Sequence, residues 1–334
     1  MTDFIETEKL YPLKFEPIYQ RRVWGGTLMS EKLRRDPPAG TGESWEVSDR
    51  PEAQSRIANG ELAGAELGQL VRRYGAALIG SAAQTSDRFP LLVKLIDAGE
   101  RLSLQVHPDA EAAESIGNGA EPKTEMWYVI DSRPGSVILA GMNSRSSRQL
   151  LEDKLHSAEV EQLFQSYPSV PGDAYFIPAG LPHAIGAGNL ILEIQQNSDT
   201  TYRLSDWGRV DSQGRARELH VENGLRSIHF AGLTSPRVAG VFGKAPRNRK
   251  YDIINRCPYF YVCELHLTER WNDDTSSRSF HLLSVVSGGL TVRRGAQSVK
   301  VAAGETALVP ACWGVYQADP ETPGEETIVI KTTL

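Results

Sequence analysis

The sequence predicts a mainly β protein, built from antiparallel sandwiches or barrels. Gly and Pro separate many short runs rich in β-branched and aromatic residues, and strands this short and closely spaced are typical of such folds. Helical periodicity is confined to two stretches, near 61–80 and 146–168. The runs GDAYFIPA (172–179) and GETALVPA (304–311) share one pattern, which indicates an internal duplication.

Six strands are predicted between residues 91 and 196. They are LLVKLIDA (91–98), LSLQVH (102–107), EMWYVID (125–131), SVILAG (136–141), DAYFIPA (173–179) and NLILEIQQ (189–196). The two helical stretches carry apolar residues at helical spacing, which we interpret as core-facing stripes. We interpret 146–168 as an insertion between strands.

The duplication aligns EMWYVIDSRPGSV (125–137) with HLLSVVSGGLTV (281–292), and this places Glu125 opposite His281. In the first copy, a longer stretch of chain separates the two aligned runs than in the second copy. The difference is about the length of the 146–168 insertion. The second copy has Val315 where the first has His183. We therefore expect a catalytic N-terminal domain at 1–235 and a metal-free C-terminal domain at 240–334.

Composition restricts the class of protein and its partners. The 334 residues are 40% hydrophobic and 23% charged, as in an ordinary soluble globular protein, and the net charge of −6 argues against nucleic acid or an anionic membrane as the main partner. No signal-peptide pattern and no membrane-length apolar run occurs. The three cysteines lack CxxC spacing, which argues against a thiolate zinc site or a disulfide framework. We expect a cytoplasmic protein; its oligomeric state stays open.

Four side chains form a candidate metal site. Gln105 and His107 lie two residues apart on one predicted strand, Glu125 begins the next, and His183 follows a Gly- and Pro-containing turn. Alternate residues of a strand share a face, so Lys123 is expected beside Glu125. Each residue alone would more often be exposed. Together they form a sulfur-free N/O site inside a barrel, which suits Zn, Fe, Mn or Ni.

The turn before His183 resembles the second motif of the cupin superfamily, G-x5-P-x-G-x2-H-x3-N. The matching residues are Gly172, Pro178, Gly180 and His183. The final Asn is not matched, since position 187 is Ala, and the H-x-H of the first motif is replaced by Gln105-x-His107. The resemblance implies tandem cupin-type (jelly-roll) barrels with a small helical insertion.

Most of residues 10–210 resembles the type I phosphomannose isomerases, specifically their short bacterial form. The segments that carry the resemblance are VWGG (23–26), GESWEVSDRP (42–51), FPLLVKLIDAGERLSLQVHPD (89–109), KTEMWYVID (123–131), PGDAYFIPAGLPHAIG (171–186) and QQNSDTTYRLSDWGR (195–209). The resemblance implies that mannose 6-phosphate and fructose 6-phosphate are interconverted through an enediol. It also implies one Zn²⁺ per chain, held by Gln105, His107, Glu125 and His183.

The resemblance further implies roles for cationic and polar residues. Arg203 and Lys123 would serve the reaction, while Ser103 and Lys94 would help to hold the phosphate of a small phosphosugar substrate. The proton-shuttling base is not settled by the sequence: Lys123, Glu193, His183 and a metal-bound water are all candidates. Glu193 is a candidate because its strand ends near Arg203.

Two rival functions come from other classes. His107-Pro-Asp109 with His183 also fits the H-x-D…H ligand set of non-haem iron oxygenases. We expect Asp109 instead to be the N-cap of a helix, because Pro108 interrupts the strand and AEAAES follows. The second rival is a catalytically silent sugar-phosphate-binding regulatory protein. Such a protein would be expected to lose Arg203 or a metal ligand, and this chain has both.

Overall fold

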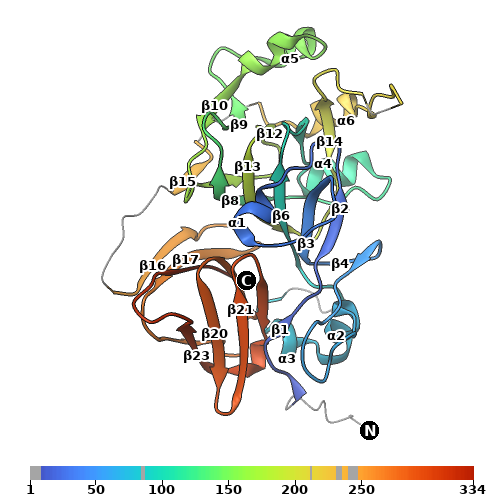
Figure 1. The fold of residues 1–334 in the computed structure, drawn as a ribbon. Helices are drawn as coiled ribbons and strands as arrows, with labels where there is room; N and C mark the ends of the chain where they lie inside the picture. Colours follow the sequence, from blue (N-terminus) through green and yellow to red (C-terminus); the bar gives the residue numbers. More distant parts are fainter. Residues whose placement is uncertain (1–8, 84–86, 211–212, 231–234, 240–246) are drawn as a thin grey trace. The chain divides into compact units, whose positions relative to one another are not determined.

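The computed structural model describes residues 9–83, 87–210, 213–230, 235–239 and 247–334. The fold is mainly β, as predicted (Figure 1). Contacts divide the chain into two compact units, and each unit contains two large sheets. Unit 1 comprises Met1–Ile18, Trp45–Val93 and Phe242–Leu334, and unit 2 comprises Tyr19–Ser44 and Lys94–Val241.

Unit 2 contains a five-stranded sheet, ordered β10-β9-β12-β7-β14, and most of a seven-stranded sheet, ordered β15-β11-β8-β13-β6-β3-β2. The division between the units passes through β2, β3 and β6. The strand bounds are β2 Ile18–Arg21, β3 Thr41–Val47, β6 Leu91–Ala98, β7 Leu104–Val106, β8 Glu125–Ser132, β9 Val137–Met142, β10 Phe164–Pro168, β11 Ala174–Ile177, β12 His183–Ile185, β13 Asn189–Gln196, β14 Tyr202–Ser205 and β15 Arg237–Ala239.

Apolar side chains fill both faces of the five-stranded sheet. One buried cluster joins it to the seven-stranded sheet, with Ile138 and Ile185 on one side and Trp127 and Ile191 on the other. A second cluster covers its opposite face with helical residues. The helices of unit 2 are α1 Leu28–Leu33, α4 Ala110–Ile116, α5 Arg148–Lys154, the 3-10 helix η2 Ala158–Leu163 and α6 Val221–Ser227. Buried side chains of α5, η2 and α6 belong to this second cluster.

The helix predicted at 146–168 is correct only in part. Residues 148–154 and 158–163 are helical, but 164–168 form strand β10, which pairs with β9 through Tyr167 and Ile138. The apolar residues Phe164 and Tyr167 fit a helical stripe by spacing, yet the hydrogen bonds offered by the edge of β9 hold this segment extended. The physical reason is long-range pairing, which local periodicity does not report.

Unit 1 contains a six-stranded sheet, ordered β1-β22-β19-β24-β17-β16, a four-stranded sheet, ordered β18-β23-β20-β21, and the pair β4-β5. The bounds are β1 Leu13–Lys14, β4 Asp49–Arg50, β5 Ala53–Gln54, β16 Arg249–Ile254, β17 Tyr261–Leu267, β18 Trp271–Asp274, β19 His281–Ser287, β20 Gly289–Arg294, β21 Gln297–Ala302, β22 Thr306–Val309, β23 Val315–Pro320 and β24 Thr327–Thr333. The helix predicted near 61–80 is two helices, α2 Leu67–Tyr74 and α3 Ala76–Ile79. They are separated at Gly75, whose φ is 47°.

The units do not follow the single boundary expected at 235–240. Strand β1 pairs with β22, placing Leu13 opposite Leu308, so the N-terminal residues extend a sheet formed by the C-terminal part of the chain. The segment 45–93 belongs to the same unit. The contiguous division into 1–235 and 240–334 is therefore replaced by a discontinuous one.

The strand registers support the internal duplication. Glu125 pairs with Ile177 in one copy, and His281 pairs with Val309 in the other, as the alignment of the two runs requires. A matching backbone hydrogen bond follows in each copy, from Gly172 N to Val129 O (2.9 Å) and from Gly304 N to Val285 O (2.7 Å). The second copy encloses an apolar core that includes Leu283, Val292 and Trp313.

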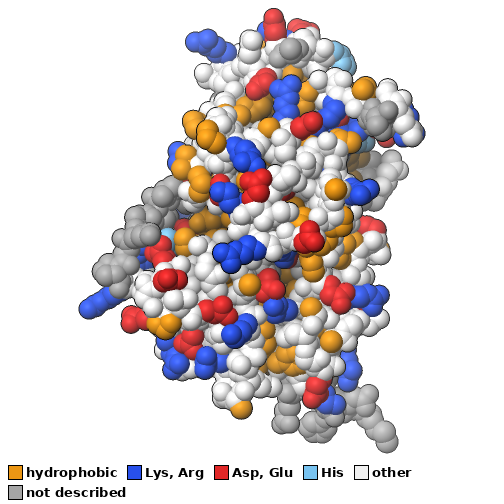
Figure 2. Space-filling view, in the orientation of Figure 1, with side chains coloured by type: hydrophobic (Ala, Val, Ile, Leu, Met, Phe, Trp, Pro, Cys, Tyr) orange, Lys and Arg blue, Asp and Glu red, His pale blue; other side chains and the backbone are white. Residues whose placement is uncertain are grey.

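Three further observations concern the surface and the cysteines. On the face drawn in Figure 2, acidic and basic side chains are interspersed. The three cysteines carry free thiols. Among the described residues, no helix has the length and apolar character needed to cross a membrane.

Candidate active site

The strands of the five-stranded sheet place three of the predicted residues side by side. Arg203 on β14 pairs with Gln105 on β7, and Gln105 pairs in turn with His183 at the start of β12. The neighbours Leu104 and Val106 point into the helix-covered core. Because side chains alternate along a strand, Gln105 projects from the opposite face, toward the interior between the two sheets.

The seven-stranded sheet contributes the facing residues. Glu125 begins β8 opposite Gln195 of β13, and Glu193 lies opposite Trp127. Lys123 precedes β8, and its Nζ lies 2.9 Å from Oε2 of Glu125, so the predicted pairing of ammonium and carboxylate is present.

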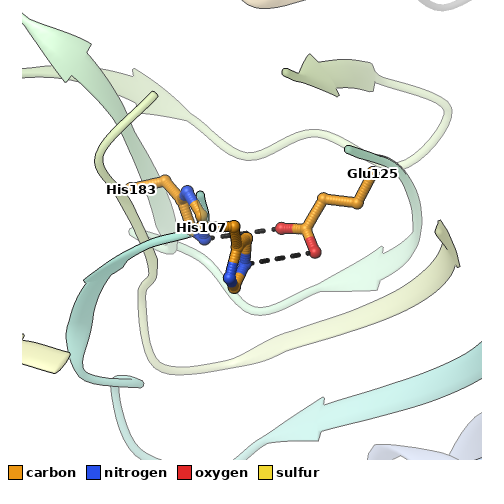
Figure 3. A group of neighbouring side chains, drawn as sticks. All are labelled: His107, Glu125 and His183. Carbon is orange, nitrogen blue, oxygen red and sulfur yellow. Dashed lines mark ion pairs between the residues drawn. The ribbon is translucent and has the colours of Figure 1, made fainter. Parts of the chain in front are cut away.

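Two imidazoles and one carboxylate converge in the interior (Figure 3). Nε2 of His107 lies 3.4 Å from Oε2 of Glu125, and Nε2 of His183 lies 3.4 Å from Oε1 of the same carboxylate. Their ligand atoms all lie within 4.8 Å of one another, and the three side chains are at most 1% exposed. Among the described residues this is the cluster of His, Cys, Asp or Glu whose geometry suits a metal ion.

Backbone carbonyls orient both imidazoles. Nδ1 of His107 lies 2.9 Å from the carbonyl of Thr200, and Nδ1 of His183 lies 2.8 Å from that of Leu181. A carbonyl only accepts hydrogen bonds, so each Nδ1 carries the proton and each Nε2 presents its lone pair to the cluster.

Burial and charge set the protonation states that a divalent metal requires. Burial lowers the pKa of His183 to about 3, and burial with the charge of Lys123 lowers the pKa of His107. Burial alone would raise the pKa of Glu125, but Lys123 and His107 hold it well below the usual range. Neutral imidazoles and an ionised carboxylate are the metal-binding forms.

The polar atoms of the cluster fit a bound cation. Nε2 of His107 and Oε1 of Glu125 are buried acceptors without a hydrogen-bond donor among the described residues, and the buried Oε2 of Glu125 has the ammonium of Lys123 at 2.9 Å. Buried polar atoms in folded proteins are nearly always satisfied, and a cation would satisfy both acceptors at once. The amide nitrogen of Gln105 lies 3.3 Å from Nε2 of His183, and exchanging the amide O and N positions would bring its oxygen to the centre as a fourth ligand.

A cavity of about 480 Å³ opens beside the cluster. Its lining includes Gln105, Lys123, Glu193, Arg203, Ser103 and Lys94, so six of the predicted site residues border one space. The Oγ of Ser103 donates to Oε1 of Gln105 at 3.3 Å. Nζ of Lys94 lies between two carboxylates, 3.5 Å from Glu193 and 3.7 Å from Asp199.

Glu193 is surrounded by donors and cations at the cavity wall. Nε1 of Trp127 donates to its Oε2 at 2.9 Å, and the ammonium groups of Lys94 and Lys123 lie 3.5 and 4.0 Å from its Oε1. Burial and the negative charge of Glu125 nevertheless raise the pKa of Glu193 above its ordinary value. Raising the pKa of a carboxyl group makes its ionised form a stronger base.

Lys123 and Arg203 are the two cations predicted to serve the reaction. Burial would lower the pKa of Lys123, but Glu125 and Glu193 raise it, so the group is an ammonium. Arg203 is half-buried and donates from Nη1 to the carbonyl of Glu218 at 2.7 Å, while its buried Nε has no partner among the described residues.

The iron ligand set of the oxygenase rival is not assembled. Asp109 is the N-cap of α4, as predicted, and its Oδ1 accepts from the backbone N of Ala112 at 2.8 Å. Its other oxygen lies 2.8 Å from Nε2 of His229. Both oxygens of Asp109 therefore have partners outside the metal cluster.

Four charged residues that line the cavity were missed by the sequence interpretation: Arg21, Arg22, Asp199 and Arg217. Asp199 and Arg217 lie in loops, and Glu43 lies on β3, where its carboxylate binds Arg22 at 2.9 Å. Asp199 stands in the distinctive segment SDTTYRLSDW, which could have suggested it. Arg217 has no such signal, because its position depends on a long loop after β14.

Comparisons with known proteins agree with this geometry. Residues 12–128 match the model of the "Phosphomannose isomerase type I, catalytic domain". The mannose-6-phosphate isomerase ManA of Bacillus subtilis is 34% identical over 313 residues, covering 92% of this chain and 96% of ManA. The chain belongs to the type I phosphomannose isomerases. The predicted membership is thereby confirmed.

Solved structures of other phosphomannose isomerases share the fold. The crystal structure of the Bacillus subtilis mannose 6-phosphate isomerase superposes with a TM-score of 0.85 at 29% identity, covering 96% of this chain and 99% of that one. A mannose 6-phosphate isomerase solved with bound zinc and yttrium has a TM-score of 0.74 at 17% identity, covering 97% and 99%. The second likeness shows the fold alone.

Proposed function

We propose that this phosphomannose isomerase interconverts mannose 6-phosphate and fructose 6-phosphate through an enediol, with one Zn²⁺ per chain. The observation that carries the proposal is the buried cluster of His107, Glu125 and His183, which has unsatisfied ligand atoms and lies beside a cavity lined by Arg203, Lys123 and Glu193. The names of the relatives support the substrate, and zinc in a structural neighbour supports the metal.

The metal would be held by Gln105, His107, Glu125 and His183. Zn²⁺ so held would supply a Lewis acid for the sugar oxygens at carbons 1 and 2. Imidazole and carboxylate ligands without sulfur agree with this ion, and the reaction needs no change of oxidation state.

Glu193 is proposed as the base that carries the proton between carbon 2 and carbon 1. Its raised pKa suits it to both steps, since the same group must take the proton from one carbon and return it to the other. The alternative His183 is unsuited, because its Nε2 faces the metal cluster and its Nδ1 is bound to the carbonyl of Leu181. Lys123 is also less suited, because an ammonium with a raised pKa has no lone pair to accept a proton.

The cations have a separate task. Negative charge develops on the oxygens at carbons 1 and 2 as the enediolate forms, and preorganised donors stabilise that charge most strongly in the transition state. Arg203 provides a planar, permanently charged donor next to Gln105. Lys123 adds an ammonium beside Glu125. We propose these two residues as the electrostatic stabilisers of the reaction.

The phosphate roles of Ser103 and Lys94 stay predictions. Ser103 lines the cavity with a hydroxyl that can donate. The surroundings of Lys94 argue against phosphate binding there, because an anion at its ammonium would also meet Glu193 and Asp199. We propose instead that Lys94 positions Glu193.

A coupled assay for fructose 6-phosphate formation tests the function. We expect turnover of mannose 6-phosphate by the purified protein, loss of turnover after treatment with a chelator, and recovery on addition of Zn²⁺. In deuterated water the product should acquire solvent deuterium at carbon 1, because an enediol passes the proton through an exchangeable base. Absence of turnover in the metal-loaded protein would favour the silent sugar-phosphate-binding alternative.

A further inference from the structure

Arg203 and Arg217 both line the active-site cavity. Arg209 and Arg217 both bind the carboxylate of Asp206, which is only 6% exposed. Burial alone would raise the pKa of Asp206, but the two arginines lower it. Arg203 lies close enough to Arg217 that their mutual repulsion, together with burial, lowers the pKa of Arg203.

Among the described residues, positively charged groups outnumber buried carboxylates near Arg203 and Arg217. Arg209 and Arg217 bind the buried carboxylate of Asp206, and Arg203 lies near Arg217; Arg203 and Arg217 line the active-site cavity, whereas Asp206 and Arg209 line a neighbouring one. The other carboxylates nearby, on Glu100 and Glu218, have side chains 68% and 84% exposed, where water screens them. Crowding like charges in a partly buried place is unfavourable unless an anion compensates them.

The guanidinium group of Arg217 is held in place by Asp206 and borders the cavity. Its Nε donates to Oδ2 of Asp206 at 2.8 Å and its Nη2 donates to Oδ1, which fixes the plane of the guanidinium. The Nη1 donors have no partner among the described residues, and Arg217 lines the same cavity as Arg203 and Lys123. Arg203 donates to the carbonyl of Glu218, the residue after Arg217, so the loop that carries Arg217 is fastened to strand β14.

The part of the cavity lining around Lys94 and Lys123 has a different charge balance. There the ammonium groups of Lys94 and Lys123 face Glu125, Glu193 and Asp199. A phosphate dianion placed there would meet these carboxylates, whereas near Arg203 and Arg217 it would meet a surplus of planar donors. Guanidinium groups bind phosphate oxygens in pairs and with fixed geometry.

We propose that Arg217 binds the phosphate group of the sugar phosphate and is held in position for this by Asp206. This inference rests on the proposed isomerase function. The reacting carbons and the phosphate lie at opposite ends of an open-chain hexose phosphate. Carbons 1 and 2 would therefore lie by the metal cluster, with the phosphate near Arg217. Arg217 thus determines the preference for phosphorylated over unphosphorylated sugars.

The test compares Arg217→Ala and Arg217→Gln with the parent enzyme. Losing one charge-assisted contact should raise the KM for mannose 6-phosphate about 10- to 100-fold. Because this contact is made equally in the ground and transition states, kcat should stay within a few-fold of the parent value. Inorganic phosphate should inhibit the parent competitively, and its inhibition constant should rise in both variants. Arg217→Lys should recover only part of the affinity, because an ammonium lacks the planar fork.

The control is Arg148→Ala, which removes the same charge from an exposed helical position in the same unit, outside the cavity. It should leave the KM and the phosphate inhibition at the parent values. If the Arg217 variants fold and both quantities are unchanged, the inference is overturned. A fall in kcat alone would overturn it too, because Arg217 would then act on the reaction and not on the phosphate.

Calorimetric titration with inorganic phosphate separates this inference from the proposed function. A parent protein without isomerase activity that binds phosphate, and loses this binding in Arg217→Ala, would retain the anion site while the function fails. An active parent enzyme whose phosphate binding is unaffected by Arg217→Ala would retain the function while the anion site fails.

Discussion

Replacing Trp127 by Phe should shift the pH dependence of the reaction to higher pH, because the change removes a hydrogen bond to Glu193. The indole Nε1 donates to Oε2 of Glu193 at 2.9 Å, and both side chains are buried. A donor to a carboxylate stabilises its ionised form, so removing it raises the pKa of Glu193 beyond the increase already caused by burial and Glu125.

The magnitude follows from the energy of that bond. A hydrogen bond to a charged group contributes about 1.5–3 kcal/mol, and 1.36 kcal/mol corresponds to one pKa unit. The pKa of Glu193 should therefore rise by about 1–2 units. Because the base must be ionised to take the proton from carbon 2, kcat falls as pH decreases through this pKa, and the acid limb of the profile should shift to higher pH.

The assay is kcat as a function of pH, since kcat reports ionisations in the enzyme–substrate complex and not those of the free phosphosugar. Metal content must be measured as well, because the ring of Trp127 packs edge-on against His183 with centroids 5.2 Å apart. Trp313→Phe is the matched control: this indole is also buried, but its Nε1 has no hydrogen-bond partner among the described residues. An acid limb that stays in place, or shifts to lower pH, in a metal-loaded Trp127→Phe enzyme would refute Glu193 as the base.

Three further outcomes are expected. Arg203→Ala should keep its metal but lower kcat by about 10²–10³-fold, with little recovery in Arg203→Lys; an unchanged kcat with a raised KM would make Arg203 a substrate-positioning residue. The His107→Ala, His183→Ala double variant should lose its metal in elemental analysis, and stoichiometric retention would contradict the ligand assignment. His281→Ala should keep both the metal and near-parent activity, whereas loss of one metal equivalent would show that the C-terminal copy binds metal.

Local patterns in the sequence correctly predicted two features of unit 2. The alternation of Leu104, Gln105 and Val106 has one solution once the apolar pair is buried under helices, and it directs Gln105 toward the cavity. The N-cap role of Asp109 was equally legible, because a helix start has a local chemical requirement. These predictions depend on the nearest few residues.

The features that were missed depend on distant parts of the chain. The strand at 164–168 forms because the edge of β9 is available, and β1 belongs with the C-terminal sheet because Leu13 meets Leu308. Neither partner can be found by periodicity. Arg217 enters the cavity only because Asp206, eleven residues earlier, binds its guanidinium. Long-range pairing and loop conformation account for all three.

The two copies of the barrel carry residues of opposite charge at one equivalent strand position. In the first, Glu193 lies opposite Trp127, two residues after Glu125; in the second, Lys331 lies opposite Leu283, two residues after His281. Lys331 thus occupies the position of the proposed base, and its ammonium forms an ion pair with Asp273.

In the second copy, His281 lies beside other polar side chains. Its Nδ1 lies 2.8 Å from the hydroxyl of Tyr316, and burial with the charge of Lys331 lowers its pKa to about 4. A neutral imidazole could in principle bind a cation, but the ammonium of Lys331 already neutralises Asp273 and repels further positive charge. In the first copy, by contrast, Nε2 of His107 and Oε1 of Glu125 are buried acceptors without a hydrogen-bond donor among the described residues. We therefore expect a metal centre in the first copy, where two imidazoles and a carboxylate meet, and none in the second, where the described residues place one imidazole beside the ion pair of Lys331 and Asp273.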